Sequence, residues 1–93
     1  MKPTAVGLTW YRREEDFVRL KAMSKDSEEL PDTYDEWLED AKNVLGTLTL
    51  QGLNVVKVYL DPETFPAWCK AKGYEMDGVA RSRYATDFAA GKI

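Results

Sequence analysis

Histidine is absent from this sequence, and cysteine occurs only once, as Cys69. A lone cysteine cannot form an internal disulfide, and without histidine the usual partner of a catalytic thiol or a zinc ion is missing. We therefore expect no metal site and a reducing compartment. Because Cys69 follows Trp68 in an apolar pattern, we expect it to be a buried core residue rather than a nucleophile.

The sequence also lacks any apolar run approaching the ~20 residues that a membrane-spanning helix requires. The charged segment 12–16 follows the N-terminal residues closely and leaves no room for the apolar region of a signal peptide. The glycines are isolated, so no glycine-rich loop indicates a phosphate or nucleotide site. We expect a cytoplasmic protein with no cofactor and no membrane partner.

The length and composition favour one small folded domain over residues 1–93. The chain is short for even a single domain, which argues against dividing it. Hydrophobic residues make up 44% of it and aromatic residues 12%, which is enough for a packed interior.

Acidic residues are concentrated in one segment. Residues 26–40 carry eight acidic and no basic side chains, although the net charge of the whole chain is only −3. The simplest interpretation is a solvated helix face, because acids are favoured near helix N-termini. The alternative is an acidic surface that imitates nucleic-acid phosphates and inhibits a basic protein. The block comprises Asp26, Glu28, Glu29, Asp32, Asp35, Glu36, Glu39 and Asp40.

Two segments have the pattern of β-strands. In residues 4–11 the side chains alternate, so that Val6, Leu8 and Trp10 share one face and Tyr11 lies on the other. Residues 53–60 are rich in β-branched and aromatic side chains, with Val56, Val58 and Leu60 on one face.

Four segments have helical patterns: 14–24, 34–51, about 64–73 and 77–91. The clearest starts with Thr33 and Glu36, which form a capping box ahead of apolar residues at helical spacing. Asp61 and Asp77 are expected to cap the third and fourth helices, and Gly52, Gly73 and Gly91 to end the second, third and fourth.

The predicted fold is therefore a two-layer α/β (α+β) domain of order β-α-α-β-α-α with a two-stranded sheet. Two helices between the strands allow a right-handed crossover, which favours parallel over antiparallel pairing. We expect all the helices on the face of Val6, Leu8, Trp10, Val56, Val58 and Leu60. The opposite face is then uncovered, and we expect it to form a homodimer interface or to bind another protein. The candidate interface residues are Tyr11, Val55, Lys57 and Tyr59.

Arginines form two local clusters, one after the first strand and one in the last helix. Together they give a candidate basic patch of Arg12, Arg13, Arg81 and Arg83. The sequence pI near 4.9 argues against nucleic acid as the partner of this patch.

The segments WYRREEDF (10–17), LPDTYDEW (30–37) and VVKVYLD (55–61), with Trp68-Cys69, resemble a group of small, uncharacterised bacterial proteins. This resemblance implies a bacterial domain and brings no activity, cofactor or site residue. The leading hypothesis is a non-enzymatic interaction or regulatory module. A small enzyme that uses carboxylate and tyrosine chemistry, with no metal or nucleotide, is the alternative.

Overall fold

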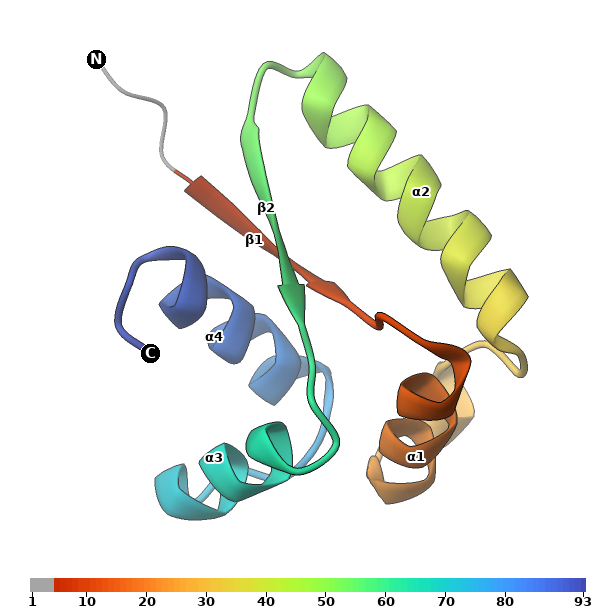
Figure 1. Ribbon diagram of the computed structural model, residues 1–93, viewed down its shortest axis with the longest axis vertical. Helices are drawn as coiled ribbons and strands as arrows, with labels where there is room; N and C mark the ends of the chain where they lie inside the picture. Colours follow the sequence, from red (N-terminus) through yellow and green to blue (C-terminus); the bar gives the residue numbers. More distant parts are fainter. Residues whose placement is uncertain (1–4) are drawn as a thin grey trace.

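The computed structural model describes residues 5–93 and has the predicted order of elements (Figure 1). Strand β1 (Ala5–Trp10) leads to helix α1 (Glu14–Met23), the short 3₁₀ helix η1 (Ser27–Glu29) and the long helix α2 (Tyr34–Leu50). Strand β2 (Asn54–Tyr59) then leads to α3 (Thr64–Lys72) and α4 (Gly78–Ala89). No helix in the described range has the length and apolar character needed to cross a membrane.

The two strands form a parallel sheet, which confirms the preferred pairing. In the register, Gly7 lies beside Val56, Thr9 beside Val58 and Trp10 beside Tyr59. The connection between the strands runs through α1 and α2, as a parallel crossover requires.

Local capping signals explain where the helices begin and end. The Thr33 hydroxyl accepts the backbone N–H of Glu36 at 3.2 Å, which confirms Thr33 as the predicted cap. The Glu36 carboxylate reaches back to the Thr33 hydroxyl, which donates to it at 3.2 Å. Asp61 accepts the N–H groups of Glu63 and Thr64, both at 2.8 Å, so α3 begins three residues after its capping carboxylate. Asp77 caps α4 in the same way through Ala80. At the C-terminal end of α3, Gly73 has the left-handed φ of 74°.

Helices pack on both faces of the sheet, so the prediction that all of them share one face is wrong. In Figure 1, α4 lies on one side of the crossed strands and α2 lies on the other. Neighbouring residues of paired strands point to the same face, so the register groups Thr9 with Val58 and Trp10 with Tyr59. The alternation within each strand was right, but the two strands were matched in the wrong phase.

Tyr11 is consequently not a surface residue, and its place in the predicted interface is corrected. Its side chain is 1% exposed and belongs to the core with Phe17, Leu20 and Val58. The rings of Tyr11 and Trp37 meet edge to face at 4.7 Å, which ties β1 to α2. The Tyr34 hydroxyl donates to the Tyr11 carbonyl at 3.0 Å and closes the same corner.

Strand β1 and helix α4 approach each other unusually closely at Gly7. A Cβ atom at this position would lie 2.1 Å from the backbone oxygen of Ala85. The Thr9 hydroxyl reaches the same helix and donates to the Arg81 carbonyl at 3.4 Å. Glycine is therefore required at position 7 by the contact between backbones, not by its own dihedral angles.

The change Gly7→Ala is expected to destabilise the fold by about 3 kcal/mol, because backbone atoms of α4 must move to admit the methyl group. Gly46→Ala is the matched control. Gly46 lies within α2 with open space around it, so alanine there is expected to increase the free energy of unfolding by about 0.5–1 kcal/mol. Urea unfolding measures both, and equal effects would contradict the packing of α4 on β1.

Candidate functional site

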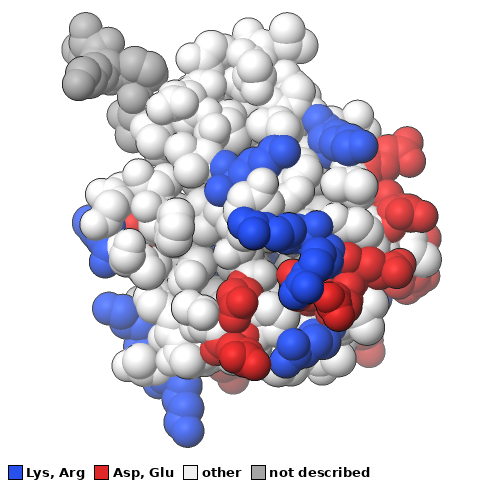
Figure 2. Space-filling model, viewed as in Figure 1, with Lys and Arg blue, Asp and Glu red and all other residues white. Residues whose placement is uncertain are grey.

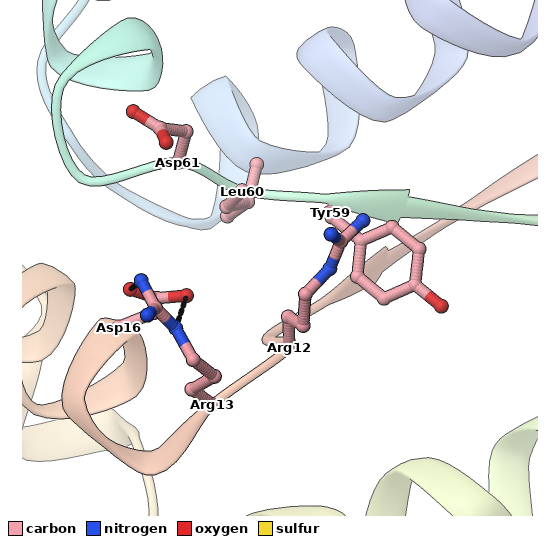
Figure 3. Close-up of a pocket in the computed structure, with 6 residues that line it drawn as sticks. All are labelled: Arg12, Arg13, Asp16, Tyr59, Leu60 and Asp61. Carbon is pink, nitrogen blue, oxygen red and sulfur yellow. Dashed lines mark hydrogen bonds and ion pairs between the residues drawn. The ribbon is translucent and has the colours of Figure 1, made fainter.

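A crevice lies at the carboxyl ends of the two parallel strands (Figure 3). Its volume is about 380 Å³, and it is lined by Arg12, Arg13, Asp16, Tyr59, Leu60 and Asp61. Both strands end here and their following helices begin here. In open α/β sheets this end of the strands is the usual place for ligands.

Most of the charges in the crevice are already used within the fold. Arg13 contacts Asp16 at 3.2 Å and Glu15 at 2.8 Å, and Figure 3 shows it turned toward Asp16. The N–H groups of Thr64 and Glu63 lower the pKa of Asp61, which keeps this carboxyl ionised as the cap of α3. A carboxyl with a lowered pKa is a poor general acid at neutral pH.

Arg12 is the arginine of the crevice that forms no ion pair with the described residues. Its guanidinium carbon lies 4.4 Å from the centre of the Tyr59 ring, and Figure 3 shows it over that ring. Lys57 lies two residues before Tyr59 on the same face of β2, and its ammonium nitrogen is 4.3 Å from the ring centre of Trp10. Two cation–π pairs, Arg12 with Tyr59 and Lys57 with Trp10, therefore lie at the carboxyl end of the sheet. Figure 2 shows Lys and Arg side chains gathered over this part of the surface.

The structure places the four arginines of the predicted basic patch in different surroundings. Arg81 forms a double hydrogen bond with Asp26, one at 3.0 Å, and its side chain is only 12% exposed. Arg83 lies over the ring of Tyr74, the second residue after α3, with 5.6 Å between its guanidinium carbon and the ring centre. Arg12 and Arg13 line the same crevice.

The other three predicted interface residues lie together on β2, on the side of α2 rather than beside Tyr11. Lys57 and Tyr59 are exposed, and Val55 is half-buried. The register sets all three on the face that carries Trp10. This face is covered by α2 at the Trp10 end, where the rings of Trp10 and Trp37 meet at 5.3 Å.

A second candidate surface is defined by the absence of charge. Residues 3–11 and 43–56 contain no Asp, Glu, Lys or Arg. The fold brings these two runs together, because the first contains β1 and the second contains the end of α2 and the start of β2. Figure 2 shows the upper part of the molecule, where α2 ends, without charged side chains. We call the surface formed by residues 5–9 and 43–56, the described parts of these runs that are not buried beside the crevice, the uncharged end.

Apolar side chains at the uncharged end are only partly buried. Val6, Leu8, Leu45 and Leu48 have intermediate exposure, Val44 is 46% exposed and Leu50 is 90% exposed. Interface cores differ from the rest of a protein surface mainly by their lack of charged residues. The two charge-free runs were visible in the sequence, and a scan for charge rather than for apolar periodicity would have found them.

Residues proposed for other chemistry have structural roles. Asp26 pairs with Arg81, and Glu36 completes the cap of α2, so part of the acidic block is used inside the fold. Cys69 is a buried free thiol, and burial raises its pKa. Burial also raises the pKa of Tyr11 and Tyr84, which makes both less ready to ionise.

A family model described as a domain of unknown function, DUF8829, matches residues 2–92. The chain belongs to this family. The match spans nearly the whole chain, and the family description assigns no activity. Comparison with curated proteins and with solved structures finds no match.

The ion pair between Asp26 and Arg81 predicts a pH dependence of stability. The hydrogen bond from Arg81 lowers the pKa of Asp26 in the folded state. The contribution of this ion pair to the free energy of unfolding is therefore complete above the unfolded-state pKa of Asp26. It is lost as the pH falls through the lower, folded-state pKa. Asp26→Asn is expected to cost about 3 kcal/mol at neutral pH, since it leaves Arg81 buried without its counter-charge.

Asp32→Asn is the control for this experiment. Asp32 lies 3.8 Å from Lys21, but its side chain is 94% exposed, so little change in stability is expected. Urea unfolding of both variants and the wild type from pH 7 down to pH 2 measures the difference. A cost of Asp26→Asn that stays constant over this range would show that the ion pair is not its source.

Proposed function

We propose that this chain is a non-enzymatic protein-interaction module that forms a homodimer through its uncharged end. The observation that carries the proposal is the convergence of two charge-free segments into one surface with half-buried apolar side chains. The chain as a whole is 31% charged, so two converging runs without any charge stand out from the rest of its surface. A contiguous exposed apolar patch of this kind marks an interaction site. A partner chain that covers it removes apolar area from water without burying a charge.

The weakness of the sheet supports the same proposal. Two strands alone are marginally stable in water, and each strand has one edge without a strand neighbour in the described part of the chain. A bacterial cytoplasmic setting belongs to the proposal as well. The single free cysteine supports a reducing, cytoplasmic compartment. The resemblance of the segments around Trp10, Trp37 and Tyr59 to small bacterial proteins supports a bacterial origin.

The electrostatics of the crevice favour the module over the alternative of a small enzyme. A general acid at neutral pH requires a carboxyl whose pKa is raised. Asp61 in the crevice is instead held ionised by the backbone N–H groups of Thr64 and Glu63. Asp26, which lies outside the crevice, is held ionised by its hydrogen bond from Arg81. Arg12 remains free to contact an anionic group, which suits a binding surface as well as a catalytic one.

The mass in solution tests the proposal. Light scattering over a dilution series is expected to give twice the chain mass of 10.6 kDa for the wild type. Val6→Glu places a charge among half-buried apolar groups at the uncharged end and is expected to give a monomer. Val18→Glu is the matched control, because Val18 is 56% exposed on α1 and lies outside this surface.

Circular dichroism of each variant separates loss of association from loss of fold. A wild-type mass of 10.6 kDa throughout the dilution series would overturn the homodimer. Monomer formation by both variants would move the interface away from the uncharged end.

A further inference from the structure

The two open edges of the sheet can be identified from one hydrogen bond and the register. The Leu60 N–H donates to the Trp10 carbonyl at 3.0 Å, so the backbone groups of Trp10 point toward β2. In a parallel ladder the direction alternates along each strand. The outward-pointing backbone groups of β1 are therefore those of Ala5, Gly7 and Thr9, and those of β2 are Val55, Lys57 and Tyr59. None of these outward groups has a backbone partner among the described residues outside the β1–β2 ladder itself.

The β2 edge carries protection against pairing with another strand. Lys57 lies in the middle of this strand and holds its ammonium over Trp10, while Arg12 covers the ring of Tyr59. Two copies paired about this position would bring like charges opposite each other, which is destabilising. A lysine in an edge strand is a common device that prevents such pairing.

The β1 edge has no such protection. The segment Ala5–Trp10 contains no charged residue and no proline. It also pairs with β2 without a break in the register, so no bulge turns its edge away. An unprotected edge of this kind is a template for another strand.

We propose that the β1 edge pairs with β1 of a second copy, antiparallel and about a two-fold axis at Gly7, to give a four-stranded sheet. This inference rests on the proposed homodimer and assigns its contact. In this arrangement Gly7 lies opposite Gly7 of the second copy, and Ala5 lies opposite Thr9. The outward N–H and C=O groups at positions 5, 7 and 9 of one copy then face the same outward groups of the other and can form hydrogen bonds with them. Val6 then lies opposite Leu8 of the second copy, in the close type of antiparallel pair with Cα atoms about 4.5 Å apart.

The charges of the two edges favour a second copy over a different partner. A neutral edge gives no electrostatic attraction to a charged peptide, whereas it meets its own copy without opposing charges. The pairing puts half-buried Val6 and Leu8 against each other and extends the sheet to four strands. Since β2 keeps Lys57 at the outside, the enlarged sheet ends at two protected edges and assembly stops at the dimer.

Disulfide crosslinking tests both the edge and the register. The variants Val6→Cys and Leu8→Cys are prepared separately and oxidised alone and as a mixture. The proposed register puts position 6 of one copy opposite position 8 of the other, within the distance that a disulfide allows. The mixture is expected to give a crosslinked dimer in at most half of the chains, because exchange also forms unmixed dimers. Each variant alone is expected to give none.

Control measurements make each outcome decisive. Cys69 is retained, because it is only 2% exposed. The oxidised wild type measures how much crosslinking Cys69 itself gives. Light scattering under reducing conditions verifies that each variant keeps the wild-type mass and that mixed dimers are able to form. Crosslinking by Val6→Cys alone or Leu8→Cys alone would overturn the register. A wild-type dimer whose mixed variants do not crosslink would overturn the β1 edge but leave the proposed function standing. A monomeric wild type would overturn both.

Discussion

The contact between Gly7 and the backbone of Ala85 determines how the rest of this small molecule is assembled. Because glycine leaves no Cβ in the way, α4 lies directly against β1 and closes one face of the sheet. That approach also positions Arg81, whose carbonyl accepts the Thr9 hydroxyl and whose guanidinium pairs with Asp26. One close contact thus fixes the sheet, the last helix and the segment after α1 relative to one another. It leaves β1 covered on the α4 face but open along its outer edge.

Short-range signals in the sequence were sufficient to predict the elements. The capping box at Thr33 and Glu36, the carboxylates Asp61 and Asp77, and glycines such as Gly73 act within one helical turn, so no tertiary information is needed to interpret them. The parallel sheet followed from the length of the connection between the strands. These predictions are confirmed with boundaries that differ by one or two residues in the described range.

The relation between distant residues could not be obtained in this way. Alternation shows which side chains share a face within one strand, but only the register shows which faces of two strands coincide. The wrong phase between β1 and β2 put Tyr11 at the surface, although it is a core residue. The ion pair between Asp26 and Arg81 joins residues far apart in the sequence, and no pattern in the residues around either one predicts it. The role of Gly7 was equally hidden, since its neighbour belongs to the last helix.

The proposed dimer associates through the edge of β1 and leaves the edge of β2 free. Amide hydrogen exchange of the wild-type protein, followed by NMR, tests it without any substitution. The amides of Gly7 and Thr9, which point outward from β1, are expected to exchange as slowly as that of Trp10, which points toward β2. The amides of Lys57 and Tyr59 are expected to exchange rapidly. Rapid exchange at Gly7 and Thr9 in a protein with a dimer mass would show that the β1 edge is not paired.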